Sequence, residues 1–400
     1  MPLLTSRAEF ARTFDAGPPS PLRLAEAEGK RLRIALVTEY YYPHLGGVTE
    51  HVHFFAQEAR KFGHHVDIIT SNIPNAEPDP HVIRLGYSQS IYNNGSQARI
   101  TLGWGLRKEM RRALARGDYD IVHIHSPLHP VLPVLAMQEA QCPVVGTFHT
   151  YFDSSLGYAV FRKQCQRRLD SMQAVIAVSH STTVAMNRYF DVDWTIIPNG
   201  IDLDVFRPDV SKPPQIRDDM PSILFLGRFD PRNGLTTLID SFKKVRGRNR
   251  QAQLVVVGDG PLRKHYYRSA GGDPDITFVG AVLKERPNFY AHSTVYACPT
   301  TKASFGITLL ESMACETAIV CSDILGFRDV VKNDREALMT HCGDTTELAD
   351  ALVRVLDDED LRTRLGRTGR ERAQRYSWQA VTSAVLDVYA AVLGRVPTGA

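Results

Sequence analysis

The chain lacks the features that mark several specialised classes of protein. Its 400 residues include only six cysteines, none in a C-x-x-C pair, so the sequence predicts free thiols in a reducing compartment rather than a disulfide framework. The formal net charge is only +3, which excludes a general binder of nucleic acid. No apolar run reaches the roughly 20 residues of a membrane span, and the first residues lack an export signal. We expect a cytoplasmic protein that is at most peripheral on the inner face of the cell membrane.

What the chain does contain is an alternation of short apolar segments, rich in β-branched residues, with helical patterns. A first series runs from residues 33–38 (RIALVT) to 194–200 (WTIIPNG), and a second from 222–227 (SILFLG) to 318–323 (AIVCSD). Each segment has the length and composition of a buried parallel strand. Because a chain of this length suits two domains, the pattern predicts an α/β fold with two Rossmann-like, doubly wound domains.

The composition also predicts where these domains begin and end. Residues 1–30 show no sustained periodicity and predict a mobile extension, whereas the prolines and charges of residues 208–221 predict a linker. The expected domains are therefore 31–207 and 222–377, followed by an amphipathic helix within 378–400. Open α/β sheets bind ligands at the carboxyl ends of their strands. Two such domains therefore predict a central cleft lined by the loops that directly follow strands.

A loop with functional potential follows the first strand of each series. Gly46 and Gly47 precede a helix, where glycine lets the backbone approach a ligand and the helix N-terminus attracts phosphate; the alternative is a plain tight turn. In the segment GRFDPRNG, Arg228 follows a buried strand, where a guanidinium suits a diphosphate. The alternative there is a surface arginine paired with Asp230. The G-x-G-x-x-G fingerprint of dinucleotide-binding proteins is absent.

A third loop lies within residues 300–314 (TTKASFGITLLESMA) and leads into another helix. Ser304, Phe305 and Gly306 precede its first turn, whose free N–H groups predict a second anion site. Glu311 lies further along this helix, where its carboxylate would accept hydrogen bonds from two ribose hydroxyls. The alternative for Glu311 is an ordinary solvent-exposed glutamate.

The histidines are concentrated in the first half of the chain. His123 and His125 alternate on one expected strand and so share a face, and His149 ends the next strand. His125 and His149 are therefore expected to converge on one ligand, where neutral imidazoles bond sugar hydroxyls; the alternative is that nearby backbone satisfies them. A metal site needs a third ligand, and none stands at an obvious spacing, so the sequence predicts no metal.

The helix expected at residues 107–116 is strongly basic. Lys108, Arg112 and Arg116 repeat every four residues, with Arg111 beside them, and apolar residues form the opposite face. A helix of this kind docks on anionic lipid. The alternative is an ordinary solvated helix face.

Taken in order, these segments resemble a known enzyme family. A resemblance to the retaining glycosyltransferases of family 4 spans residues 31–392 and rests on RIALVT, GGVTEHV, DIVHIHSP, GTFHT, PNGID, FLGRFDPRNG, VVVGDGP and SFGITLLESMA. Within that family, the bacterial phosphatidylinositol mannosyltransferases are similar to this chain in YNNGSQAR, HIHSP, TFHT and RYSW. The resemblance implies the GT-B fold and transfer of a hexose, with mannose the best match, from a nucleotide-diphosphate sugar to a lipid or glycan with retention. It also implies a final helix that crosses back to the N-terminal domain.

The resemblance assigns roles to most of these residues. Arg228 and His125 are the expected catalytic residues, with His125 facing the transferred sugar. The pyrophosphate of a GDP- or UDP-sugar would meet the two glycine-containing loops and Arg228, so that no metal or other cofactor is required. The expected donor site comprises Gly46, Gly47, Arg228, Arg232, Asn233, Gly258, Val279, Ser304, Phe305, Gly306, Ile307 and Glu311. The expected acceptor side comprises Tyr41, His149, Arg111 and Arg112, the last two also facing an anionic membrane surface.

Two positions depart from the family pattern. Asn233 replaces a lysine that precedes glycine, and Ala303 replaces the first glutamate of the Glu-x7-Glu motif. Each change removes a charged hydrogen bond, a loss of about 1.5–3 kcal/mol; the neighbouring Arg232 and Lys302 are placed to compensate. Two other functions therefore stay open: a catalytically weakened nucleotide-sugar-binding or regulatory member, and a nucleotide-sugar epimerase of GT-B fold. A phosphorylase is disfavoured because no segment indicates a lysine that binds pyridoxal phosphate.

Overall fold

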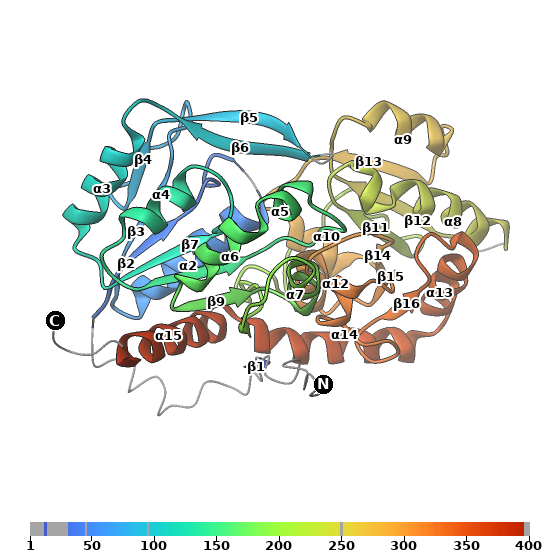
Figure 1. Ribbon diagram of the computed structural model, residues 1–400. Helices are drawn as coiled ribbons and strands as arrows, with labels where there is room; N and C mark the ends of the chain where they lie inside the picture. The colour runs from blue at the N-terminus through green and yellow to red at the C-terminus, as the bar shows by residue number, and fades with distance from the viewer. Residues whose placement is uncertain (1–11, 14–30, 45, 94–95, 249–250, 396–400) are drawn as a thin grey trace, which may run out of the picture. The chain divides into compact units, whose positions relative to one another are not determined.

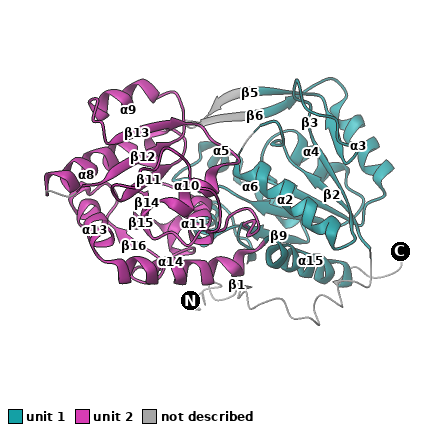
Figure 2. Ribbon diagram, turned by 180° about the vertical axis from the view of Figure 1, so that it is seen from behind, with its two compact units in different colours: residues 1–200, 378–400 teal, residues 201–377 magenta. Residues whose placement is uncertain are grey.

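The computed structural model describes residues 12–13, 31–44, 46–93, 96–248 and 251–395 (Figure 1). The chain divides into two compact units (Figure 2). Unit 1 comprises residues 1–200 and 378–400, and unit 2 comprises residues 201–377. Most of the extension expected at residues 1–30 lies outside the described residues.

Unit 1 is built on a parallel sheet whose strands run in the order β1-β10-β9-β8-β7-β2-β3-β4. These strands are β1 (Arg12–Thr13), β2 (Arg33–Val37), β3 (His65–Ser71), β4 (Val82–Leu85), β7 (Ile121–His125), β8 (Val144–Phe148), β9 (Ala174–Ala177) and β10 (Trp194–Ile196). Alternate residues of β2 enter different cores, with Ile34 and Leu36 in one cluster and Ala35 and Val37 in the other. Both faces of the sheet are therefore buried, as a parallel sheet requires.

Helices supply the apolar residues that cover these two faces. They are α2 (Gly47–Lys61), α3 (Leu106–Gly117), α4 (Leu132–Glu139), α5 (Leu156–Val160), α6 (Arg162–Asp170), α7 (His180–Asn187) and α15 (Trp378–Arg395). Residues of α2 and α15 share the cluster with Ile34, whereas α3, α4, α6 and α7 contribute to the cluster with Ala35. The terminal helix α15 thus completes unit 1: Tyr389 on it lies with its hydroxyl 2.5 Å from Nδ1 of His123 on β7.

A β-hairpin in unit 1 has no counterpart among the sequence-based expectations. Strands β5 (Tyr87–Asn93) and β6 (Ser96–Leu102) pair antiparallel in register from Tyr87–Leu102 to Asn93–Ser96. The sequence does contain an Asn-Gly pair between two strand-like runs, which is a strong hairpin signal. The hairpin was not predicted because this segment lacks chemical groups that indicate a function.

Unit 2 repeats the architecture with a parallel sheet in the order β13-β12-β11-β14-β15-β16. Its strands are β11 (Ser222–Leu226), β12 (Gln253–Val257), β13 (Ile276–Gly280), β14 (Val295–Cys298), β15 (Ile319–Ser322) and β16 (Leu338–Thr340). Its helices are η2 (Pro231–Asn233), α8 (Leu235–Gly247), α9 (Arg263–Ala270), α10 (Arg286–His292), α11 (Ile307–Ala314), α12 (Leu325–Arg328), α13 (Thr345–Asp357), α14 (Glu359–Ala373) and η3 (Gln374–Tyr376). Residues of β11 again alternate between two clusters, so this sheet is also buried on both faces.

The segment expected as a linker at residues 208–221 differs from that expectation. The structure assigns residues from Ile201 onward to unit 2. Phe206 and Ile216 are buried in its core beside Leu224, so burial of two large side chains fixes a stretch that its prolines and charges marked as loose. The N-terminal domain therefore ends near residue 200 rather than 207.

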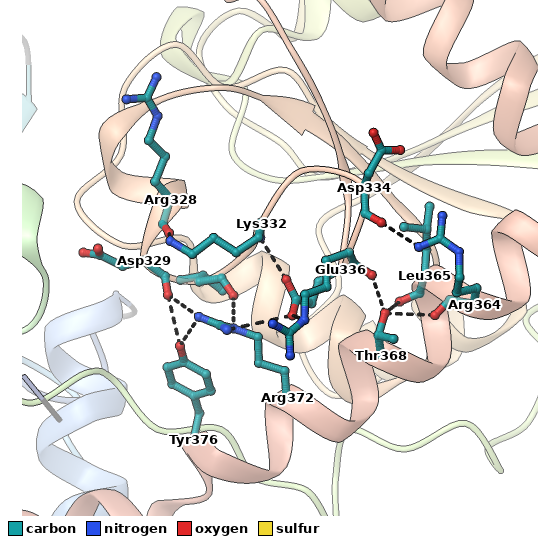
Figure 3. A network of polar contacts seen from close by, with 12 residues as sticks. Arg328, Asp329, Lys332, Asp334, Glu336, Arg364, Leu365, Thr368, Arg372 and Tyr376 are labelled. Atoms are coloured by element: carbon teal, nitrogen blue, oxygen red, sulfur yellow. Dashed lines mark hydrogen bonds and ion pairs between the residues drawn. The ribbon is translucent and has the colours of Figure 1, made fainter. Parts of the chain in front are cut away.

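A polar network ties the segment before β16 to α14 in unit 2 (Figure 3). Glu336, only 1% exposed, accepts a hydrogen bond of 2.9 Å from the backbone N–H of Lys332 and lies 3.8 Å from Arg372. Arg372 also donates to the carbonyls of Asp329 and Val330 at 2.9 and 2.7 Å. Glu336 and Arg372 thus bind backbone groups of residues 329–332 and fix this loop.

We predict that Glu336→Ala destabilises unit 2 by about 3 kcal/mol, because it removes the acceptor of the Lys332 N–H and the ion-pair partner of the partly buried guanidinium of Arg372. Glu371→Ala, at an exposed carboxylate on the same helix as Arg372, serves as the control and should change stability by less than about 0.5 kcal/mol. All three tryptophans lie in unit 1, so calorimetry and hydrogen exchange of residues 328–376 are the appropriate measurements. Equal exchange protection in both variants would contradict the role given to Glu336.

Candidate functional site

Each sheet has a switch point where the chain reverses the direction in which it adds strands. In unit 1 this point lies between β2 and β7, and in unit 2 between β11 and β14. Ligands of doubly wound folds bind outside the carboxyl ends of strands at such points. The loops that follow these four strands contain most of the residues expected from the sequence, so each unit has its own group of candidate residues.

The loop after β11 holds its arginines in two different states. Arg228 is exposed, and no described residue forms a hydrogen bond or ion pair with its guanidinium. Asp230 instead binds Arg232, accepting from its backbone N–H at 3.0 Å and from Nε and Nη2 at 3.1 and 2.9 Å. The hydrogen bonds from Arg232 lower the pKa of Asp230. The alternative in which Arg228 pairs with Asp230 is therefore wrong, and Arg228 has its donors available for a ligand.

Two glycines let neighbouring loops of unit 2 approach closely. Gly258, directly after β12, has a φ of 145°, and a Cβ there would lie 1.9 Å from the carbonyl oxygen of Gly227. At Gly234, a Cβ would lie 2.0 Å from the carbonyl oxygen of Pro299. Only glycine fits at these positions. Gly258, which was expected to contact a donor, and Gly234, which was not, thus set the spacing between the loops after β11, β12 and β14.

The loop after β14 leads into α11 through Gly306, which adopts a φ of 103° and caps the helix. Thr301 donates its backbone N–H to the carbonyl oxygen of Arg232 at 2.7 Å, so this loop and the arginine loop lie together. Ser304 is half-buried beside the N-terminus of α11. Phe305 is buried in the core, and Ile307 and Val279 pack against that core as partly buried side chains. A ligand at this end of unit 2 would meet backbone N–H groups and the exposed Arg228.

Glu311 lies in α11 with its carboxylate buried rather than in solvent. It is 1% exposed, accepts a hydrogen bond of 2.9 Å from the hydroxyl of Tyr290, and lies 2.7 Å from Nη1 of Arg286. Burial, followed by the charge of Glu311, holds the pKa of Tyr290 well above its usual range. The alternative of a solvent-exposed glutamate is therefore wrong. Tyr290 and Arg286 fix the orientation of this carboxylate.

In unit 1, Gly46 and Gly47 form the start of α2, directly after the β2 loop. Glu50 donates its backbone N–H to the carbonyl oxygen of Gly46 at 3.0 Å, which closes the first turn. No described atom lies within 4 Å of the position a Cβ would take at either glycine. Internal packing therefore does not demand glycine here, whereas the open space beside the helix N-terminus suits an approaching ligand.

Three histidines meet at the carboxyl end of the unit 1 sheet. Nδ1 of His125 lies 3.0 Å from Nε2 of His149, which confirms that the two converge. His51 on α2 joins them as a third imidazole, and the ligand atoms of all three lie within 4.8 Å of one another. His51 is held by Asn199, whose Oδ1 lies 2.9 Å from its Nδ1. These hydrogen bonds are to side chains rather than to nearby backbone. The sequence missed His51 because it lies on a helix far along the chain from the other two.

Burial keeps this cluster neutral. It lowers the pKa of His51 to about 4, partly offset by the hydrogen bond to Asn199, and lowers that of His123 to about 3. For His125 and His149, burial followed by the neighbouring histidines lowers the pKa well below its usual range. Nε2 of His125 has no hydrogen-bond partner among the described residues. A neutral imidazole with one unsatisfied nitrogen is suited to bonding a sugar hydroxyl.

Two residues of the loop after β2, Glu39 and Tyr41, are buried rather than exposed as expected for a loop. Tyr41 is 4% exposed and packs in the core, with its hydroxyl 2.9 Å from Nδ1 of His53; its side chain does not lie on an open acceptor surface. Glu39, which the sequence did not single out, is buried and accepts hydrogen bonds from Thr101 and from the backbone N–H of Leu132. Burial raises the pKa of Glu39 to about 7.

The basic helix α3 divides its arginines between two environments. Arg107 and Arg111 both bind Glu139 of α4, with Nε of Arg111 at 2.5 Å from the carboxylate. Arg112 and Arg116 instead line a cavity of about 380 Å³ together with Arg33. The charge of Arg111 is thus partly neutralised, while Arg112 and Arg116 keep an exposed basic face. Among the described helices, none has the length and apolar character to cross a bilayer.

Comparison with known proteins identifies the family. The family model "Glycosyltransferase Family 4" matches residues 45–205, and the model "Glycosyl transferases group 1" matches residues 206–372. The chain is 32% identical over 370 residues to phosphatidyl-myo-inositol mannosyltransferase of Mycobacterium tuberculosis, covering 91% of this chain and 98% of the relative. The chain is a glycosyltransferase of family 4. The corresponding enzyme of Propionibacterium freudenreichii is 31% identical over 378 residues, covering 90% and 94% of the two chains.

Solved structures confirm that this glycosyltransferase has the GT-B fold with two Rossmann-like domains. A glycosyltransferase from Rickettsia africae superposes with a TM-score of 0.75 at 17% identity, covering 92% of this chain and 100% of the other. Sucrose-phosphate synthase from Thermosynechococcus elongatus gives 0.72 at 22% identity, with the same coverage of each chain. The resemblance inferred from the sequence motifs is therefore correct for both family and fold.

The two residues of the glycosyltransferase that depart from the family pattern both have a structural role in their loops. The side-chain amide of Asn233 donates to the carbonyl oxygen of Arg228 at 2.8 Å, which closes the loop in place of a charged residue. Ala303 is half-buried against the core, and its carbonyl oxygen would lie 2.0 Å from a Cβ at Gly326. Both replacements thus fit the fold well, but neither restores the lost charge.

We predict that the imidazoles of His51, His123, His125 and His149 stay neutral down to pH 5. Their depressed pKa values mean that the unfolded chain binds protons below about pH 6.5 that the folded unit does not, so the stability of unit 1 falls as pH falls through 6.5. Imidazole ¹⁵N chemical shifts measure each ring. His341, whose pKa is raised by its hydrogen bond to Glu347, is the internal reference that should titrate above 6.5. A midpoint above pH 6 for any of the four would contradict the prediction.

Proposed function

We propose that this glycosyltransferase moves mannose from a nucleotide-diphosphate sugar to phosphatidylinositol with retention of configuration. The observation that supports it is the 32% identity to phosphatidyl-myo-inositol mannosyltransferases over almost the full length of both chains. The chemistry at the strand ends fits this proposal, because it combines phosphate-binding backbone and an available guanidinium with neutral imidazoles.

The diphosphate and the ribose of the donor, a GDP- or UDP-sugar, would bind to different residues. Its diphosphate would meet the exposed Arg228 and the N–H groups at the start of α11, where the helix dipole favours negative charge. Glu311, oriented by Tyr290 and Arg286, would accept the ribose hydroxyls. Gly46 and Gly47 would admit the phosphate close to the backbone of α2.

Retention would follow from approach of the acceptor hydroxyl on the same face as the leaving diphosphate. As the bond to the anomeric carbon breaks, a phosphate oxygen would take the proton of the attacking hydroxyl. Arg228 would stabilise the charge that develops on the leaving group, a task that in this proposal needs no metal ion. His125, neutral and with Nε2 unsatisfied, would accept or donate a hydrogen bond to the transferred sugar.

A second candidate function is a nucleotide-sugar-binding member with little transfer activity. It is favoured by two specific observations: Asn233 and Ala303 stand where the family pattern has charged residues, and Arg232 is engaged by Asp230. In that case the donor would bind normally, but the diphosphate would lack part of the charge that stabilises its departure.

We predict that Arg228→Ala lowers the transfer rate by about 10²–10³-fold, the loss seen when one group that stabilises a developing oxyanion is removed. The assay supplies GDP-mannose, UDP-glucose or UDP-N-acetylglucosamine with phosphatidylinositol vesicles and identifies products by mass spectrometry and the anomeric configuration by NMR. Arg268→Ala, at an exposed arginine of α9, is the matched control.

The outcomes separate the candidates. A rate within threefold of wild type would remove Arg228 from its assigned role. Donor binding by calorimetry without turnover on any acceptor would favour the binding function instead, and conversion of UDP-N-acetylglucosamine without acceptor would identify an epimerase.

We further propose that α3 docks the enzyme on anionic lipid. Lys108, Arg112 and Arg116 are exposed on one face of α3, and Trp104, just before the helix, is fully exposed. Basic residues near an anionic surface each contribute about 1 kcal/mol, and an exposed tryptophan suits the membrane interface. Charge alone gives weak binding that salt screens.

Reversal of all three charges, Lys108→Glu, Arg112→Glu and Arg116→Glu, should weaken binding to phosphatidylinositol-containing vesicles by at least about 100-fold. The matched control reverses three exposed basic residues on α9 in unit 2, Arg263, Lys264 and Arg268, and should bind as wild type does. Vesicle sedimentation at several salt concentrations measures both. Equal loss in the two variants would show that overall charge, not α3, is responsible.

A further inference from the structure

A second cluster of potential metal ligands lies in unit 1, away from the histidines at the carboxyl ends of the strands. His65 and Asp67 are two residues apart on β3, so their side chains share a face of the strand. His81 stands just before β4, and its carbonyl oxygen accepts the backbone N–H of Ile68 at 2.8 Å. Strand periodicity and the β3–β4 register therefore bring two imidazoles and one carboxylate together.

The distances within this cluster match those of a metal coordination sphere. Nε2 of His65 lies 3.0 Å from one carboxylate oxygen of Asp67, and Nδ1 of His81 lies 3.4 Å from the other. The ligand atoms of all three residues lie within 4.8 Å of one another. Metal–ligand bonds of about 2.0–2.2 Å place adjacent ligand atoms about 2.9–3.5 Å apart, so little rearrangement is needed to admit an ion.

A neighbouring side chain orients the carboxylate. The hydroxyl of Tyr119 donates to Asp67 at 2.8 Å, as outer partners of metal ligands commonly do. The carboxylate supplies a negatively charged oxygen ligand beside the two imidazoles.

We propose that His65, Asp67 and His81 bind one divalent transition-metal ion of the zinc, cobalt and nickel class. Two nitrogens and one oxygen suit these metals, whereas calcium and magnesium prefer ligands that are all oxygen. The imidazoles are 38% and 42% exposed, which leaves positions for water to complete the coordination. The ion joins β3 to the edge strand β4.

This site is separate from the transfer reaction. His65 is the first residue of β3 and pairs in register with Arg33, the first residue of β2, whereas the proposed reaction uses loops that follow the opposite ends of the strands. The metal would stabilise the sheet edge, since an ion bound by the folded state alone raises its stability. Loss of the site therefore leaves the metal-free chemistry proposed above unchanged.

The test is a titration of the full-length, chelator-treated protein with Co²⁺, followed by visible absorption, and with Zn²⁺, followed by calorimetry. A phosphate-free buffer is used because arginines line the adjoining cavity. Wild type should bind one ion. His65→Gln combined with His81→Gln should abolish that binding, and Tyr119→Phe should weaken it by about 10-fold or more. Metal-free thermal unfolding establishes that each variant is folded.

Two further histidine variants complete the design. His265→Gln, at an exposed position of α9 in unit 2, controls for general loss of surface histidine. His149→Gln removes one member of the other histidine cluster, and both variants should bind the ion as wild type does. The proposal is overturned if wild type binds no ion, if the His65 and His81 double variant binds it unchanged, or if His149→Gln abolishes binding.

Discussion

Burial of both faces of each parallel sheet is the constraint on which the rest of the structure depends. Alternate residues of β2 and of β11 enter opposite cores, so the strands have no solvent-facing side on which to place polar chemistry. Most polar side chains of the candidate site consequently lie at strand ends and in loops between strands and helices. The switch points of the two sheets leave room for a ligand at those ends, and the available arginine, the glycines and the histidines of this glycosyltransferase lie there.

The same burial determines the protonation states of the site. His51, His123, His125 and His149 are buried, which disfavours their charged forms. The hydrogen bond of His51 to Oδ1 of Asn199, and those of His123 with Tyr389 and Thr147, orient the first two rings. Burial also favours the neutral form of Glu39. Because the neutral form of an acid is the protonated one, its pKa is raised, whereas the pKa values of the histidines are lowered. The strand ends of unit 1 therefore carry neutral imidazoles, whereas those of unit 2 carry the exposed guanidinium of Arg228 and a helix N-terminus.

Most of the fold was predictable because strand periodicity and helix spacing are local. The strands around residues 33–38 and 222–227 have confirmed positions, and the convergence of His125 and His149 followed from their places at adjacent strand ends. What the sequence did not reveal depends on contacts distant along the chain. His51 reaches the other histidines only through packing of α2, and Asp67 meets His81 only through the register of β4. The fixed segment near Ile216 likewise reflects burial that its local composition does not predict.

In the loop after β11, the uncharged Asn233 changes which residues can supply positive charge. Asn233 donates to the carbonyl oxygen of Arg228, so it preserves the shape of the loop while adding no charge. Arg232 is adjacent, but its donors are already bound by Asp230, and releasing them would leave an acid near the diphosphate. The positive charge gained by freeing Arg232 would therefore be offset by the negative charge of the unpaired Asp230. The carboxylate of Asp230 forms its hydrogen bonds with Arg232 and not with the guanidinium of Arg228, so in the proposed reaction the stabilisation of a leaving diphosphate is assigned to that guanidinium and the N–H groups of α11.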